Sequence, residues 1–101
     1  METEYELKWL GSVKKVGENL LTKDFLIILY IGDKYYEESD NYIEMKFREY
    51  HNVMSVSTQI NVSSDMENML REQGVYDKLC FNVSDKVELD KDSMIEDYYS
   101  L

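Results

Sequence analysis

Two adjacent segments in which apolar and polar residues alternate constrain the fold more than any other feature of the chain. Apolar side chains alternate with charged ones over residues 43 to 47, and a second alternation runs over residues 54 to 62. A period of two places one kind of side chain on each face of a β-strand. His51 and Asn52, which lie between the segments, are suited to a tight turn. We therefore predict that residues 42 to 62 form an antiparallel hairpin.

The first part of the chain also favours strands. Residues 4 to 10 alternate in the same way, and residues 25 to 31 form an unbroken apolar run that is rich in β-formers. This run is predicted to be a central strand that is covered on both faces. Gly32 and Asp33 after it predict a hairpin turn, in which Gly32 supplies a positive φ, and residues 34 to 36 would pair back onto the run.

One short helix is predicted near residues 65 to 73. Ser64 and Glu67 have the spacing of a capping box, and Gly74 stands where a helix C′ residue belongs. After it, the alternation of apolar residues over 79 to 83 and again over 87 to 89 predicts two short strands.

These elements predict a single small α+β domain, with an antiparallel sheet of five or six strands and one helix. A break between strands is expected at residues 39 to 41, a cluster of turn formers. The sheet is either open or closed into a small barrel of the OB type. Residues 1 to 89 would form the compact part and residues 90 to 101 an acidic helical turn or tail. Because the chain has no proline, any exposed sheet edge must rely on charge for protection.

Composition excludes several classes of function. The 101 residues carry a formal net charge of −10, which disfavours direct binding of nucleic acid because phosphate binding depends on Lys and Arg. A single Cys80 and a single His51 allow neither an intrachain disulfide nor a Cys/His zinc site. The four glycines are widely separated, so no phosphate-binding loop is present. We expect no enzyme activity, no catalytic residues, no metal and no cofactor.

The chain is expected to be cytoplasmic. Its N-terminal residues are acidic where a signal peptide would be basic and then apolar, and its longest apolar run is too short to span a bilayer.

The distribution of the acidic residues indicates a cationic partner. Residues 85 to 101 hold six acids and two lysines, and residues 1 to 84 hold fifteen acids and nine bases, so both parts are acidic. Glu2, Glu4 and Glu6 would lie on one face of a strand, about 6.6 Å apart, and such a row resembles phosphates in its spacing. Tyrosine adds contact area at interfaces. The candidate partner-binding residues are Tyr35, Tyr36, Glu37, Glu38 and Asp40 near one hairpin and Asp90, Asp92, Glu96 and Asp97 near the C-terminus.

Small size, strong acidity, the lack of proline and the abundance of Lys, Asn, Ile, Tyr, Glu and Asp are similar to the small anti-defence proteins that phages encode, including anti-CRISPR proteins. This resemblance implies an inhibitor that acts in the host cytoplasm. It would dock on the basic surface of a nucleic-acid-handling protein and block its substrate site. No membrane association is expected.

Two alternatives remain. The first is an OB-like single-stranded DNA-binding protein, in which Trp9, Tyr42 and Tyr50 would stack on bases. Its basic strip would consist of Lys14, Lys15, Lys46 and Arg48, and its residues 92 to 101 resemble the partner-recruiting tails of such proteins. The second is a virion assembly subunit whose strand edge is completed by a partner chain. The oligomeric state does not follow from the sequence.

Overall fold

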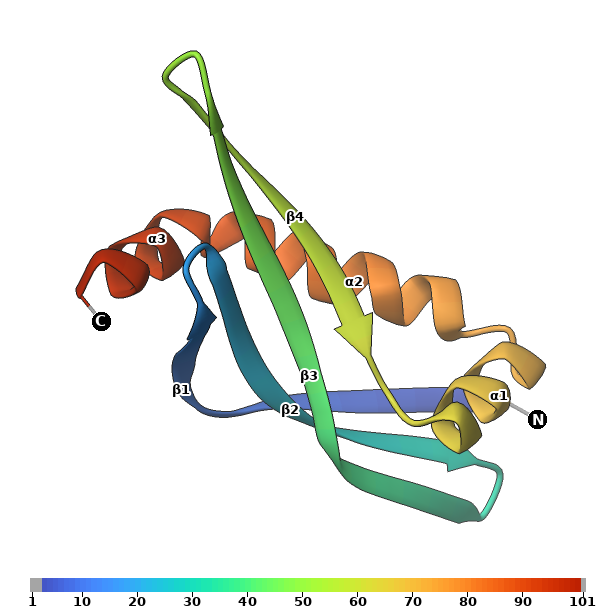
Figure 1. The fold of residues 1–101 in the computed structure, drawn as a ribbon. Helices are drawn as coiled ribbons and strands as arrows, with labels where there is room; N and C mark the ends of the chain where they lie inside the picture. Colours follow the sequence, from blue (N-terminus) through green and yellow to red (C-terminus); the bar gives the residue numbers. More distant parts are fainter. Residues whose placement is uncertain (1–2, 101) are drawn as a thin grey trace.

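The chain folds into one antiparallel sheet with three helices on one of its faces (Figure 1). The computed structural model describes residues 3–100. The strands are β1 (Thr3–Gly17), β2 (Leu20–Ile31), β3 (Lys34–Tyr50) and β4 (Val53–Asn61), and the helices are α1 (Ser64–Glu72), α2 (Tyr76–Leu89) and α3 (Lys91–Ser100). The strands pair in sequence order. The predicted α+β class is confirmed. The structure has four strands where five or six were expected, and three helices where one was expected.

Residues 76 to 89 form helix α2 and not the two predicted strands. Leu79, Val83 and Val87 recur every four residues and are buried against the sheet, whereas Phe81 is 69% exposed. A spacing of four places the three buried side chains on one helix face. The prediction failed because the exposed Phe81 completes an apparent alternation between residues 79 and 83.

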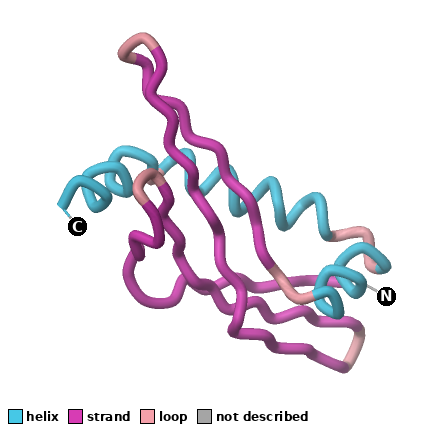
Figure 2. The backbone as a smooth tube through the Cα atoms, viewed as in Figure 1, coloured by secondary structure: helices cyan, strands magenta, loops and turns pink. Residues whose placement is uncertain are grey.

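The sheet is sharply bent, and the bend falls on two irregularities of strand pairing (Figures 1 and 2). In β1 the pairing with β2 shifts between Leu10 and Lys14, where Gly11 has a φ of +68° that favours glycine. The pairing of β3 with β2 shifts between Phe25 and Ile27 of β2, where two residues of β3, Ser39 and Asp40, lie opposite one and form a bulge. The turn formers at residues 39 to 41 therefore bend one long strand and do not end it.

Asn41 holds the bulge of β3 together. Its side chain is buried, and its Nδ2 donates hydrogen bonds to the backbone oxygens of Glu38, at 2.8 Å, and of Phe25, at 3.3 Å. A bulge leaves backbone groups without their ladder partners, and the Asn41 amide satisfies two of them.

The predicted turns are confirmed. Gly32 has a φ of +64°, and His51 and Asn52 both have positive φ values at the tip of the β3–β4 hairpin. Helix α1 is capped one residue earlier than predicted, because the Ser63 hydroxyl accepts from Met66 N. It ends at Glu72, one residue before the predicted end, and Gly74, with a φ of +72°, occupies the predicted C′ position.

Of the two predicted arrangements, the open sheet is confirmed and the OB-type barrel is wrong. Among the described residues β1 and β4 form its two edges.

Helix α3 packs against the end of the sheet formed by the β1–β2 turn. The Tyr98 hydroxyl donates to Asn19 Oδ1 at 2.9 Å, and the Tyr98 ring lies 5.3 Å from that of Phe47. No helix within residues 3–100 combines the length and apolarity needed to cross a membrane.

Candidate protein-binding site

The side of the sheet that faces away from the helices carries an apolar strip, with Glu4 and Glu6 on one side of it and Glu37 on the other. On β1, Tyr5 faces α2, where Asn82 donates to its hydroxyl, so its neighbours Glu4 and Glu6 point the other way. The pairing of the strands extends this alternation to β2 and β3. We call the resulting surface the acidic sheet face. It consists of Glu4, Glu6, Lys8, Leu26, Ile28, Tyr30, Tyr35 and Glu37.

The middle of the acidic sheet face is apolar and only half-buried. Ile28 pairs with Glu6 on one side and with Glu37 on the other, so two exposed glutamates flank it in one cross-strand row. Tyr30 lies in the next row, where its ring is 6.4 Å from that of Tyr35. The pattern of an apolar centre with a polar rim is typical of protein interfaces.

Electrostatic coupling links the tyrosine of this strip to the glutamates. The Tyr30 hydroxyl donates to Glu6 Oε2 at 3.2 Å. Partial burial, followed by the hydrogen bond to Glu6 and the negative charges of Glu6 and Glu37, raises the pKa of Tyr30 above its usual value of 10.0. The shift favours the protonated phenol, which is the form that donates this hydrogen bond to Glu6.

The structure divides the candidate residues near the β2–β3 hairpin between the two sides of the sheet. Tyr35, which is 65% exposed, and Glu37 belong to the acidic sheet face. Tyr36 and Glu38 point to the helix side, where Glu38 accepts hydrogen bonds from Ser63 at the start of α1. Asp40 is exposed in the bulge of β3.

The C-terminal candidates form a separate cluster. Asp90 ends α2, and Asp92, Glu96 and Asp97 are exposed on α3. Helix α3 and the β2–β3 turn lie at opposite ends of the molecule, whose longest dimension is 49 Å (Figure 1). The two sets of predicted residues therefore do not form one surface.

Sequence reasoning missed the apolar strip. It identified the row of glutamates on β1, of which Glu2 lies outside the described residues, but it assigned Leu26 and Ile28 to a strand covered on both faces. Helices cover one face only, and on the other these side chains remain half-buried. The sequence feature that could have revealed the strip is the apolar run of residues 25 to 31. A strand that is apolar on both faces leaves one of them uncovered when helices pack on only one side of the sheet.

The predicted basic strip is divided unequally between the two sides of the sheet: Lys15 faces the helices, whereas Lys14 points to the helix-free side, as Lys46 and Arg48 do. Lys14 Nζ lies 2.8 Å from Asp24 Oδ2, and Lys15 lies over the Tyr98 ring. Lys46 and Arg48, by contrast, line an open groove of about 500 Å³ with Ser55 and Ser57, on the helix-free side of the β3–β4 hairpin.

The proposed stacking residues do not share one surface either. Trp9 faces the helices and packs edge-on against Phe25, whereas Tyr42 and Tyr50 point to the helix-free side.

The single histidine and the single cysteine lie in different parts of the fold. His51 lies at the hairpin tip against the Tyr50 ring, and the half-buried Cys80 lies on α2. The described residues contain no cluster of three or more side chains suited to hold a metal ion. Comparisons with protein-family models, with curated proteins and with solved structures give no match.

Proposed function

We propose that this chain is a non-enzymatic protein-binding module of the phage inhibitor type, and that it docks through the acidic sheet face. Its partner is the basic surface of a nucleic-acid-handling protein, whose substrate site it blocks. The observation that carries this proposal is the row in which Ile28 lies between Glu6 and Glu37.

The two parts of the surface contribute in different ways. Burial of Leu26, Ile28 and Tyr30 supplies affinity, since contacts at the dry centre of an interface dominate binding energy. The carboxylates of Glu4, Glu6 and Glu37 at the rim steer a cationic partner and fix its orientation. Across the first three strands, about 4.8 Å apart, Glu6 and Glu37 are separated by roughly 10 Å. Carboxylates on both sides of the strip, at this distance, can pair with basic residues on both walls of a nucleic-acid groove.

Charge reversal tests the proposal. We would immobilise the wild-type chain and a Glu6→Arg/Glu37→Arg variant and identify by mass spectrometry the proteins that each retains from a bacterial host lysate. We expect the wild type to retain a nucleic-acid-binding protein that the variant loses. Added nucleic acid should compete for the same partner.

A second variant controls for net charge alone. Asp92→Arg/Asp97→Arg changes the net charge by the same amount on α3, at the other end of the molecule, and should retain the partner. If the α3 variant loses the partner and the sheet variant keeps it, the docking surface is the C-terminal cluster and not the acidic sheet face. Recovery of no nucleic-acid-binding protein by the wild type would contradict the inhibitor proposal.

One observation favours single-stranded nucleic acid as an alternative ligand. Tyr42, Lys46, Arg48 and Tyr50 project from β3 on the same side, and two of them line the groove described above. Aromatic and basic residues in one strip can stack on bases and contact phosphates. A labelled oligonucleotide at low salt should then bind the wild type and not a Lys46→Ala/Arg48→Ala variant, and absence of binding to the wild type would exclude this alternative.

A further inference from the structure

The outer edge of β4 lacks the charges, prolines and bulges that usually protect a sheet edge. The strand has no charged residue and no proline, and it pairs with β3 residue for residue from Val53 to Asn61 without a bulge. The described residues supply no strand beyond it. Exposed edges are usually blunted by charge, proline or bulges, because their backbone groups can otherwise pair with another chain. The opposite edge, β1, carries five charged residues and two irregularities of pairing, so the lack of this protection is specific to β4.

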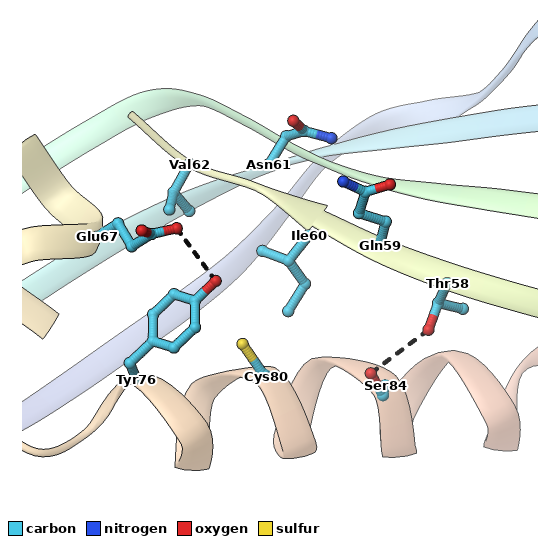
Figure 3. A pocket seen from close by; sticks show the side chains of 9 residues that line it. All are labelled: Thr58, Gln59, Ile60, Asn61, Val62, Glu67, Tyr76, Cys80 and Ser84. Atoms are coloured by element: carbon cyan, nitrogen blue, oxygen red, sulfur yellow. Dashed lines mark hydrogen bonds between the residues drawn. The ribbon is translucent and has the colours of Figure 1, made fainter. Parts of the chain in front are cut away.

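Space for another strand exists beside β4. An open groove of about 380 Å³ lies between residues 59 to 62 and α2, and it is closed at one end where the hydroxyl oxygens of Thr58 and Ser84 are 3.5 Å apart (Figure 3). Ile60 and Val62 point toward the helix, Gln59 and Asn61 point away from it, and Cys80 lies on the helix between Tyr76 and Ser84 (Figure 3). Farther along the strand, the β3–β4 hairpin extends beyond the helices (Figure 1).

Charge favours a second copy of the same chain as the occupant. The chain as a whole carries −10, but residues 41 to 62 contain two acids, Glu44 and Glu49, and two bases, Lys46 and Arg48. This hairpin is neutral, so two copies can approach one another here without the repulsion that the rest of the surface would impose.

The strand is also complementary to itself. A two-fold axis at Ser57, the central residue of β4, would pair Met54 with Ile60 of the second copy and Val56 with Thr58. These half-buried side chains all face the helix side, and Ser55 and Gln59 would meet on the opposite side. Because side chains alternate with a period of two, this register places the helix-side residues of one copy opposite the helix-side residues of the other. The two copies of Lys46 would be separated by three strand spacings, roughly 14 Å, which is beyond the screening length in physiological salt.

We infer that two copies of this chain pair antiparallel through β4 and form a continuous eight-stranded sheet. The pairing covers the unprotected edge and fills the groove beside α2. It does not use the acidic sheet face, which stays available to a different partner in each copy. Failure of this inference therefore leaves the proposed function untouched, and the reverse also holds.

Site-specific oxidation tests the register. In a Cys80→Ser background, Ser57→Cys would bring two cysteines together at the axis, where antiparallel Cα atoms lie about 4.5 to 5.5 Å apart, within the range of a disulfide. We expect a covalent dimer on a non-reducing gel. Ser12→Cys, an exposed position on the β1 edge, is the matched control and should stay monomeric.

Sedimentation tests the association itself. The wild type should sediment as a dimer of 12.1 kDa chains. Ser57→Lys should sediment as a monomer, because two like charges would face each other at the axis. Ser12→Lys should remain dimeric, and circular dichroism should show that both variants are folded. A monomeric wild type, including one that takes up a strand from another protein, would overturn the inference, and so would a dimeric Ser57→Lys variant.

Discussion

The carboxylate of Glu38 accepts two hydrogen bonds from Ser63, one from its backbone N–H at 3.1 Å and one from its hydroxyl at 2.6 Å. The same hydroxyl oxygen accepts from Met66 N and caps α1. Two residues that are 25 positions apart thus fix the start of the helical layer to the strand β3. Glu38 immediately precedes the bulge, so the bend of the sheet and the position of α1 are coupled through one side chain.

Removal of this contact should destabilise the protein. We expect Ser63→Ala to lower the free energy of unfolding by about 1 kcal/mol, the usual cost of losing an N-cap. Glu38→Ala should cost a similar amount, and the double variant should cost less than the two together, because the residues act as one unit. Urea denaturation of the three variants measures this. Glu37→Ala, whose side chain points to the other side of the sheet, should stay within about 0.5 kcal/mol of the wild type.

The amide of Asn41 should be required for the bulge. Asn41→Ala leaves the buried oxygen of Phe25 and the oxygen of Glu38 without their donor, and this costs about 1 to 3 kcal/mol of unfolding free energy. Ser39→Ala, at an exposed position of the same bulge, should have little effect. Equal stability of the two variants in urea would contradict the role assigned to Asn41.

The helical register of residues 76 to 89 predicts very different effects for two apolar residues. Leu79→Ala should cost about 2 to 5 kcal/mol, because the side chain is fully buried. Phe81→Ala should cost less than about 0.5 kcal/mol, because Phe81 is exposed. Thermal and urea unfolding of both variants test this. In the strand that the alternation favoured, the two side chains would share one face and both substitutions would be costly.

Those two residues also show what the sequence could and could not predict. The hairpin of residues 42 to 62 was predictable because both of its strands alternate cleanly and its turn residues tolerate positive φ. Helix α2 was not, since Leu79, Val83 and Val87 fit a period of two as well as a period of four. The deciding fact is that Phe81 is exposed, and this depends on the position of the sheet.

The candidate site was predictable in part for a related reason. Alternation placed Glu4 and Glu6 on one face of the first strand, and charge identified Glu37 together with Glu38 and Asp40 near a hairpin. The strand register then places Glu4, Glu6 and Glu37 around Ile28. The sequence could not indicate that Glu38 is held by Ser63 or that α3 lies far from the β2–β3 turn, because both depend on contacts between distant parts of the chain.

Stability at alkaline pH should depend on Tyr76. Burial, then its neighbour Cys80, then the charge and hydrogen bond of Glu67 raise the pKa of Tyr76 above 10.0, and its hydroxyl lies 3.3 Å from Glu67 Oε1. A group whose pKa is raised by folding stabilises the protein fully below its unfolded pKa. This contribution is lost as the pH rises from about 10 through the folded pKa. Urea unfolding between pH 8 and pH 11.5 should therefore show a decline in stability that is smaller in Tyr76→Phe. An identical decline in both proteins would show that the Tyr76 phenol has the same proton affinity in the folded and unfolded chain.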